Sequence, residues 1–361
     1  MRRTALLLVL LASALASGAA VAAPLVVEPQ GAAATLANPA GWADKQIRAV
    51  VARGAMADSV ATFRPDEPIT RGELADALAM LGYMSPQPLE PDRPVLIREL
   101  DARLVAVLGL SSVSRSIRLA ARDAELEPTP YLGTETIARL LGLRVNHPQG
   151  QEELELLPGQ PATRAEAAHS IARLLELGDW QKQQIAELAS WFSFPELTDW
   201  QRVVVARALR FVGHPYVWAG FSERPQQLYY GTAPGGFDCS GFVWRVYKAQ
   251  PFGDAPLLTS TLKGRTTVAM SAEVPRSQRV GLAALRPADV VFFGSRGLKS
   301  KPQEIGHMGI YVGGGWFVHS SANGVTLQPL QGGYLTSFAW GRSPLVEAGL
   351  EVVEPQGLAR L

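Results

Sequence analysis

Cys239 is the only cysteine of the 361-residue chain, and it stands where a helix is expected to begin. Asp238 before it is a favoured N-cap residue, and apolar residues follow at helical spacing through Tyr247. In a first helical turn, unpaired N–H groups and the helix dipole favour a thiolate over a thiol. We therefore expect Cys239 to be a nucleophile with a lowered pKa, although a lone cysteine can also serve as a small buried hydrophobic residue.

A thiolate nucleophile needs a base within hydrogen-bonding reach, and the base needs a polar partner that orients it. The glycines at 313–315 separate two apolar runs that carry His307 and His319, which predicts a β-hairpin. In such a hairpin the two rings are opposed or diagonal on one face, with Cβ atoms about 5–8 Å apart. We expect His307 to be the base and His319 its partner. His214 precedes a proline in an expected loop and is interpreted as a structural residue.

The region 199–345 contains the elements that must position these side chains. An amphipathic helix is expected first, followed by the helix that carries Cys239. Three short apolar runs typical of β-strands come next: DVVFF at 289–293, HMGIYV at 307–312 and WFVHS at 316–320. We therefore predict an α+β domain in which the Cys239 helix packs on an antiparallel sheet.

Residues 38–176 are predicted to form an all-α domain with an internal repeat. Five residues recur at a constant offset of 93 positions (158 − 65): Pro65, Pro68, Thr70, Arg71 and Glu73 return as Pro158, Pro161, Thr163, Arg164 and Glu166. Repetition of a helix–loop–helix unit explains this offset, and Thr70 with Glu73 fits the capping-box pattern. Residues around Glu99 keep the prolines but lack the Thr-Arg pair, so we interpret them as a degenerate middle unit.

Composition limits the remaining possibilities. Hydrophobic residues make up 47% of the chain and the net charge is +1, which is typical of a globular protein and gives no nucleic-acid-binding pattern. Residues 1–22 have the pattern of a secretory signal peptide, and no later segment is apolar enough for a transmembrane anchor. The aromatic segment 177–198 is expected to connect the two domains and to pack against one of them.

Six segments of the C-terminal half resemble, in order, the NlpC family of cell-wall cysteine peptidases. They read GHPYVWAG, GFDCSGFVWRVY, GRTTVAMS, RPADVVFFG, HMGIYVGGGWFVHSS and GVTLQPL, within residues 200–330. The resemblance implies a reduced papain-like fold without a cofactor. It also implies hydrolysis of amide bonds in peptidoglycan stem peptides, most often between D-glutamate and the following diamino acid.

The resemblance also implies roles by position. The nucleophile, base and third polar residue would be Cys239, His307 and His319, and the substrate-binding residues would be Tyr216, Asp238 and Ser240. Two departures affect the cleft: Trp218-Ala219-Gly220 replaces the usual Trp-Gly-Gly, and residues 222–234 are inserted before Gly-Phe-Asp-Cys. Activity is expected to be lost at acid pH as the histidine pair gains a second proton and the thiolate is quenched.

The repeated helical unit resembles the S-layer homology domain in its segment TFRPDEPITRGE, residues 62–73. In that family three repeats form a module that binds secondary polysaccharide of the bacterial cell wall. The resemblance implies a secreted protein held at the cell wall or envelope, with Arg71 and Arg164 as candidate donors to an acidic polymer. The repeats could instead be a structural spacer. We expect the peptidase half, begun near Leu177, to cleave small soluble muropeptides without them.

Other interpretations of the C-terminal residues stay open. The cysteine and two histidines could bind zinc, although their spacing differs from the usual closely spaced ligand pairs and no second cysteine is present. We therefore expect no metal. The domain could also be inert within a wall-binding scaffold, or it could transfer an acyl group to an amine instead of water. Sensitivity to iodoacetamide without sensitivity to chelators would separate thiol from metal chemistry.

Overall fold

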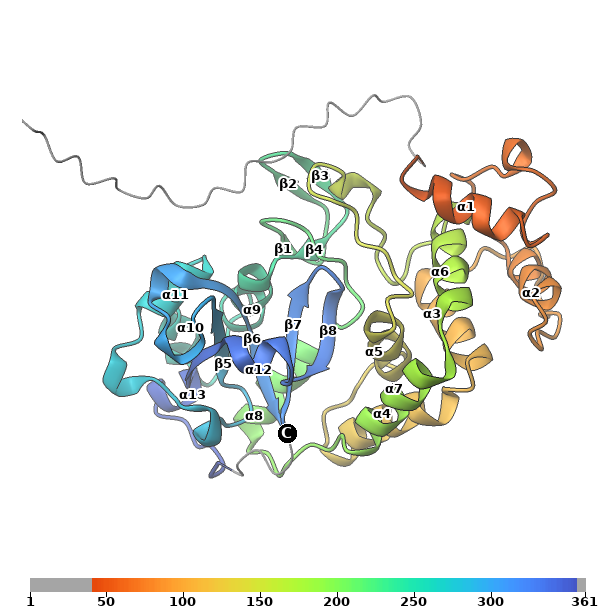
Figure 1. The fold of residues 1–361 in the computed structure, drawn as a ribbon. Helices are drawn as coiled ribbons and strands as arrows, with labels where there is room; N and C mark the ends of the chain where they lie inside the picture. The colour runs from red at the N-terminus through yellow and green to blue at the C-terminus, as the bar shows by residue number, and fades with distance from the viewer. Residues whose placement is uncertain (1–40, 356–361) are drawn as a thin grey trace, which may run out of the picture. The chain divides into compact units, whose positions relative to one another are not determined.

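The structure is a computed structural model that describes residues 41–355 (Figure 1). The expected signal peptide at 1–22 lies outside the described residues. Within 41–355, no helix is long and apolar enough to cross a membrane.

The N-terminal half of the described chain consists of helices joined by proline-containing loops. Its helices are α1 (Asp44–Val51), α2 (Arg71–Met80), α3 (Ile97–Val107), α4 (Ser111–Asp123), α5 (Leu132–Leu140), α6 (Arg164–Glu176) and α7 (Asp179–Ser190). Their apolar sides meet in a core that includes Ile47, Leu78, Leu104 and Ile171. The all-helical character predicted for this region is confirmed.

Three loops, one before each of α2, α3 and α6, share a closed ring of backbone hydrogen bonds. Ile69 N donates to Ala162 O, Ala162 N donates to Val95 O, and Val95 N donates to Ile69 O, at 2.8 to 3.0 Å. Each loop thereby satisfies N–H and C=O groups that would otherwise be buried without partners. The ring also shows that the middle unit, interpreted from the sequence as degenerate, occupies a place equivalent to the other two.

The two threonine caps form as the repeat pattern predicts. Thr70 and Glu73 make a reciprocal capping box at the start of α2, and the Thr163 side chain accepts from Glu166 N at the start of α6. The middle unit has Ile97 at the position where the other two have arginine. In the other two units the arginine pairs with the capping glutamate of another unit, but Ile97 cannot form such a pair. The remaining glutamate, Glu166, is contacted by His147, whose Nε2 lies 3.2 Å from its Oε1.

The repeated arginines join successive repeats. Arg71 Nη2 lies 2.9 Å from Glu99 Oε1, and Arg164 Nη1 lies 2.6 Å from Glu73 Oε1. Arg164 is only 2% exposed, and its Nε also donates to Phe63 O at 2.7 Å. This corrects the expectation that Arg164 is a polymer-binding donor, because burial and protein acceptors already occupy its guanidinium.

The C-terminal half combines helices with an antiparallel sheet. The helices are α8 (Asp199–Leu209), α9 (Cys239–Tyr247), α10 (Pro256–Thr261), α11 (Thr267–Ala272), α12 (Gly333–Ser337) and α13 (Pro344–Glu347). The strands are β1 (Phe221–Ser222), β2 (Gln226–Leu228), β3 (Gly231–Ala233), β4 (Gly236–Phe237), β5 (Val290–Gly294), β6 (Ile305–Gly313), β7 (Trp316–Ser321), β8 (Gly324–Pro329) and β9 (Phe338–Arg342). One five-stranded sheet has the order β8-β7-β6-β5-β9, while β1 pairs with β4 and β2 with β3. The α+β fold class is confirmed, since α9 packs on β6 and β7 (Figure 1).

The sheet separates two apolar clusters. The three predicted strand runs correspond to β5, β6 and β7, whereas the sequence pattern does not predict β8 and β9. Phe292 and Ile310 join the larger cluster with α9, while Phe293 and Phe317 join the smaller cluster on the other face. Alternation along a strand therefore gives each face its own set of side chains.

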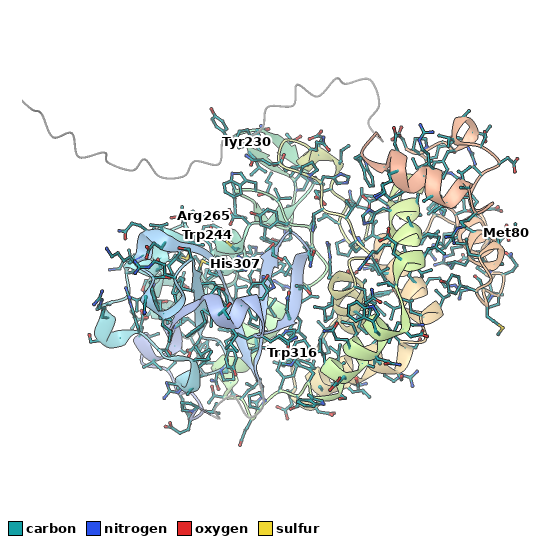
Figure 2. All side chains as sticks on the ribbon, viewed as in Figure 1. Met80, Tyr230, Trp244, Arg265, His307 and Trp316 are labelled. Atoms are coloured by element: carbon teal, nitrogen blue, oxygen red, sulfur yellow. The ribbon has the colours of Figure 1, made fainter. Side chains whose placement is uncertain are left out.

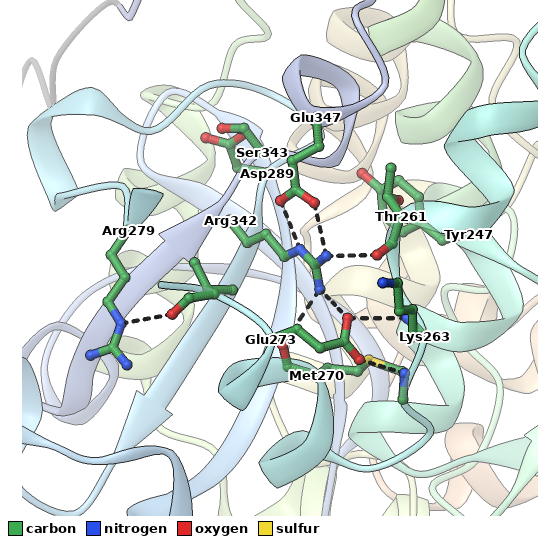
Figure 3. A network of polar contacts seen from close by, with 12 residues as sticks. Tyr247, Thr261, Lys263, Met270, Glu273, Arg279, Asp289, Arg342, Ser343 and Glu347 are labelled. Carbon is green, nitrogen blue, oxygen red and sulfur yellow. Dashed lines mark hydrogen bonds and ion pairs between the residues drawn. The ribbon is translucent and has the colours of Figure 1, made fainter. Parts of the chain in front are cut away.

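The buried Arg342 of β9 is linked to the loop that precedes α11 through Glu273, which follows α11 (Figure 3). Arg342 Nε and Nη2 each lie 2.8 Å from a Glu347 oxygen, and its Nη1 lies 2.8 Å from Glu273 Oε2. Such pairing is what a buried guanidinium requires. Glu273 in turn accepts from Gly264 N at 2.5 Å, which holds the backbone immediately before Arg265.

The aromatic connector packs on the sheet, as expected from its composition. Phe192 is 7% exposed, and its ring centroid lies 5.0 Å from that of Trp316 at the start of β7. Trp316 is labelled in Figure 2. A Cβ added to Gly313 would meet Pro195 Cδ at 2.3 Å, so the connector also lies against the β6–β7 turn.

Candidate active site

The start of α9 lies where the pairing of β6 and β7 ends. The paired register of these strands stops before it reaches the two histidines. Ser320 Oγ of β7 donates instead to Phe237 O at 2.6 Å, and the N–H group of Met308 in β6 lies near the Cys239 thiol. The thiol is therefore placed beside the strands that carry the histidines.

Cys239 is a protonated thiol in this environment. Burial raises its pKa to about 12, assisted by the charge of Asp238 and opposed by the N–H groups of Met308, Ser240 and Cys239 itself. The expectation of a lowered pKa is wrong for the free protein, because the cost of burying a thiolate exceeds the stabilisation by these N–H groups. The reaction must therefore begin with transfer of the thiol proton to a base.

A hydrogen-bonded line of three side chains crosses β6, β7 and β8. His307 Nε2 lies 2.8 Å from His319 Nδ1, and His319 Nε2 lies 3.0 Å from Gln328 Oε1. The two imidazole rings are nearly perpendicular, at 85°, with centroids 5.0 Å apart. The contact expected between the two histidines across the hairpin is therefore observed. His307 is labelled in Figure 2.

Gln328 determines where the protons sit along this line. An amide oxygen only accepts, so His319 Nε2 carries a hydrogen and His319 Nδ1 does not. His307 Nε2 must then donate to His319 Nδ1, which leaves His307 Nδ1 without a hydrogen. This free Nδ1 is the atom that can accept the proton of a thiol.

Apolar surroundings keep both imidazoles neutral. Burial lowers the pKa of His307 to about 4, and burial together with the neighbouring His307 lowers the pKa of His319 well below its ordinary value. The Phe317 ring stacks on His319 at 4.5 Å, and Tyr334 lies 5.0 Å from it. A Cβ at Gly309 would lie 2.9 Å from His319 Cβ, so glycine leaves room for this ring.

Cys239 and His307 are not joined by a direct hydrogen bond in the part of the chain that the structure describes. They are linked by the Met308 N–H group, which follows His307 in β6 and lies near the thiol. Catalytic pairs in free enzymes are often held at longer distances and tighten when substrate binds.

Gln328 is not predicted as a site residue because the sequence pattern does not predict β8. A usable signal is the Asn323-Gly324 dipeptide after β7, since such pairs are typical of hairpin turns. The register across that turn places His319 opposite Thr326, and therefore diagonal to Gln328. Gln328 thus lies on the same face as His319, one strand further along the sheet.

Gln328→Leu is expected to lower kcat by about 10-fold to 100-fold with little change in KM, by analogy with the loss of partners that orient metal-bound histidines. The leucine removes the acceptor that fixes the tautomer of His319, so His307 Nδ1 is no longer held unprotonated. Gln227→Leu, on the exposed β2–β3 hairpin, is the matched control and should keep wild-type kinetics. A wild-type kcat for Gln328→Leu would contradict the assignment of proton positions.

Asp238 caps α9 as predicted. Its Oδ1 accepts from Gly241 N at 2.5 Å and from Ser240 Oγ at 2.9 Å. Arg265, which sequence reasoning missed, donates to Ser240 Oγ at 2.9 Å and lies 3.5 Å from Asp238 Oδ1. The Ser240 side chain is buried and already donates and accepts, which corrects the expectation that it binds substrate. Among the described residues, Asp238 Oδ2 has no hydrogen-bond partner.

Tyr216 lies beside the thiol, as the resemblance implies. Burial, and then the charges of Cys239 and Asp238, raise the pKa of its hydroxyl. Its backbone pairs with Phe237, two residues before Cys239. His214 Nδ1 contacts Phe211 O at 3.0 Å, which fits the structural role expected for it.

Two features differ from the NlpC pattern noted in the sequence: Ala219 in place of a glycine, and the inserted residues 222–234. Ala219 adopts a φ of 58°, in the left-handed region where glycine is favoured, at a cost of roughly 1 kcal/mol. Arg265 Nη2 donates to Ala219 O at 3.2 Å and helps to hold this turn. The inserted residues 222–234 contain the β2–β3 hairpin, whose exposed tip carries Tyr229 and Tyr230. Tyr230 is labelled in Figure 2.

Comparison with known proteins gives a family match for each half of the chain. Residues 213–343 match the model of the NlpC/P60 family, and residues 37–75 match that of the S-layer homology domain. Both resemblances noted in the sequence are therefore confirmed for these segments. The NlpC/P60 family is a family of cysteine peptidases.

Two curated relatives and one solved structure illustrate the similarity. The probable peptidoglycan endopeptidase LytE of Bacillus subtilis is 34% identical over 131 residues, 36% of this chain and 30% of the relative. The gamma-D-glutamyl-L-lysine dipeptidyl-peptidase of Bacillus subtilis is 31% identical over 123 residues, 33% of this chain and 32% of the relative. An NlpC/P60 family protein from Bacillus cereus is 24% identical with a TM-score of 0.30, and the match covers 43% of each chain. The matched region thus spans about a third of the length of these curated relatives.

Proposed function

We propose that the protein is a thiol peptidase that cleaves amide bonds in the stem peptides of peptidoglycan. The observation that carries this proposal is the line His307, His319 and Gln328, which leaves His307 Nδ1 unprotonated on the strand whose next residue, Met308, lies near the Cys239 thiol. The name of the first curated relative supports peptidoglycan as substrate. The name of the second supports the bond between D-glutamate and the following diamino acid as the one cleaved.

The reaction starts with proton transfer from the Cys239 thiol to His307 Nδ1. The sulfur then attacks the amide carbonyl, and the N–H groups of Cys239 and Ser240, with the Tyr216 hydroxyl, stabilise the oxyanion. His307 gives the proton to the leaving amine as the C–N bond breaks. Water then attacks the thioester, its proton passes to His307, and the C–S bond breaks to release the acid and restore the thiol.

Asp238 Oδ2 is available for recognition of a substrate amine. Its Oδ1 caps the helix and faces Arg265, so the carboxylate is held in place while one oxygen stays free. A free amine at the end of a stem peptide would pair with this oxygen. Tyr216 and Asp238 are therefore the substrate-binding residues that we propose.

We further propose that the protein is secreted and that its helical repeats attach it to the cell wall through secondary polysaccharide. The match to the S-layer homology domain supports this proposal. Arg71 replaces Arg164 as the residue that could reach a polymer, because its side chain is 26% exposed. It lines a pocket of about 570 Å³ together with Arg103 and Tyr131. A bound acidic polymer would compete with Glu90 and Glu99 for its guanidinium.

The pH dependence follows from the two pKa shifts. His307 acts as base only when neutral, so kcat/KM should rise through about pH 4 and should then stay level through neutral pH. Ionisation of Cys239, with its pKa near 12, should not limit the rate below about pH 10. The loss of activity at acid pH should therefore be centred near pH 4. A histidine with the ordinary pKa of about 6.5 would place it near pH 6.5. An acid limb centred near pH 6.5 would contradict the burial of a neutral His307.

Stability must be measured alongside that profile. The folded-state pKa of His307 is lower than its unfolded value, so the unfolded chain binds the proton first as the pH falls below about 6.5. Stability therefore decreases from about pH 6.5 toward pH 4. The unfolding midpoint at each pH separates loss of fold from loss of the base.

Mass spectrometry of the fragments released from defined muropeptides tests the proposed function. Cleavage between D-glutamate and the diamino acid should yield a new free amine on the diamino acid and a free D-glutamate carboxyl. Products joined to an added amine would indicate acyl transfer. The absence of any cleavage or transfer, with the protein folded, would overturn the assignment as a peptidase.

A further inference from the structure

Asn146 of the helical half contacts two separate segments of the C-terminal half. Its Oδ1 accepts from Tyr216 N at 2.9 Å, and its Nδ2 donates to Ala322 O in the turn between β7 and β8. These contacts lie within one compact unit that contains Ala40–Leu361. Asn146 thus bridges the loop that carries Tyr216 and the turn that joins the strands of His319 and Gln328.

Arg139 of α5 reinforces this bridge from the same side. Its Nη2 donates to Gly213 O at 2.5 Å, and its Nη1 lies 3.4 Å from Asn146 Oδ1. The residue is only 1% exposed. Figure 1 shows α5 beside β8, in agreement with the contacts between these elements.

Two glycines of the C-terminal half allow this close approach. A Cβ at Gly213 would lie 2.4 Å from Glu135 Oε2, and a Cβ at Gly324 would lie 2.6 Å from Arg139 Cζ. Both glycines also have positive φ, 97° and 75°. Any larger residue at either position would push α5 away from the loop and the turn.

The two bridged segments lead directly to the reacting groups. Tyr216 pairs with Phe237, and Val217 N donates to Phe237 O at 3.1 Å, two residues before Cys239. Val325 N of β8 donates to His214 O at 2.8 Å, in the same loop. A shift of this loop would therefore be transmitted both to the thiol helix and to the strand that carries Gln328.

We propose that Asn146 is a positioning residue for the peptidase reaction, acting through Tyr216, so that the helical half is part of the catalytic apparatus. The inference rests on the proposed function. It differs from the sequence-based expectation that the peptidase half, begun near Leu177, cleaves small soluble muropeptides at close to full rate, and predicts a slower rate for such a fragment. Catalysis is sensitive to such positioning, because displacements of about 1 Å can cost about 100-fold in rate.

The test uses the full-length protein with Asn146→Ala, Asn146→Asp, Tyr216→Phe and the double variant Asn146→Ala with Tyr216→Phe. Asn146→Ala should lower kcat about tenfold on a soluble muropeptide, with KM changed less than about twofold. Asn146→Asp keeps the acceptor for Tyr216 N but loses the donor to Ala322 O, so its rate should lie between those of the wild type and Asn146→Ala. In the Tyr216→Phe background, Asn146→Ala should cost less than it does in the wild type, because part of its effect acts on the hydroxyl that is already removed.

Arg173→Ala is the matched control for stability. Arg173 Nε donates to Leu141 O at 2.9 Å, at the end of α5, so its loss weakens the helical half at a different place. It should lower the unfolding midpoint while leaving kcat unchanged. An unchanged kcat for Asn146→Ala, or losses from Asn146→Ala and Tyr216→Phe that simply multiply, would overturn the inference.

The rate of Cys239 alkylation by iodoacetamide gives a second readout that does not require the proposed function. Loosening of the Tyr216 loop should expose the thiol, so Asn146→Ala should react several-fold faster than wild type, whereas Arg173→Ala should not. If no muropeptide were cleaved but alkylation changed in this way, the proposed function would fail and the positioning contact would stand. Equal alkylation rates in wild type and Asn146→Ala would overturn the contact's role even in an active peptidase.

Discussion

Cys239→Ala is expected to lower the rate of muropeptide cleavage by at least about 10⁴-fold, the scale seen when a nucleophile is removed. The sulfur is the only thiol in the chain, and no thioester can form without it. Initial rates on a defined muropeptide, measured at neutral pH, check this expectation.

The unfolding midpoint of Cys239→Ala shows whether the variant is still folded. The side chain is small and buried, so alanine leaves only a minor cavity and the unfolding midpoint should fall by no more than a few degrees. Cys239→Ser retains the shape of the site but replaces the thiol with a weaker nucleophile, and it should also be nearly inactive. Cleavage by Cys239→Ala at the wild-type rate would rule out the thioester route.

His307→Gln is expected to have the second largest effect, a loss of about 100-fold to 10⁴-fold in kcat/KM. Glutamine can still donate to His319 Nδ1, but it cannot take the thiol proton. In this variant the thiol proton must be removed by hydroxide. The rate should therefore rise steadily with pH, whereas the wild-type rate is level above about pH 4. Kinetics between pH 5 and 9 measure both features.

His169→Gln provides the matched control for His307→Gln. His169 lies in α6 of the helical half, and burial also lowers its pKa, so it is a partly buried histidine outside the candidate site. Its replacement should leave the rate and the pH profile unchanged. Equal losses in the two variants would indicate a general effect of removing a buried histidine.

The sequence is sufficient to predict the local features of the site. Asp238 as N-cap and the position of Cys239 in the first turn follow from residue preferences within a few positions. The diagonal contact of His307 and His319 follows from strand alternation and a glycine turn. These features depend on short stretches of chain, for which backbone geometry alone sets the outcome.

Features that depend on distant packing could not be predicted. The raised pKa of Cys239 comes from burial by several elements, which the helix N-terminus alone does not reveal. Arg164 matches Arg71 in the repeat pattern, yet only Arg71 keeps an exposed part, because the loops pack differently around each of them. Asn146 is separated from Tyr216 by 70 residues, and no local pattern links them.

The most direct test of the thiol mechanism is to titrate the protein with iodoacetamide and to compare two quantities. Intact-protein mass gives the fraction of Cys239 that is alkylated, and initial rates of muropeptide cleavage give the residual activity of the same samples. A thiol nucleophile predicts that activity falls in direct proportion to alkylation and reaches zero at one label per chain, while chelators have no effect. Full activity in protein carrying one label per chain would contradict the assignment of Cys239 as the nucleophile.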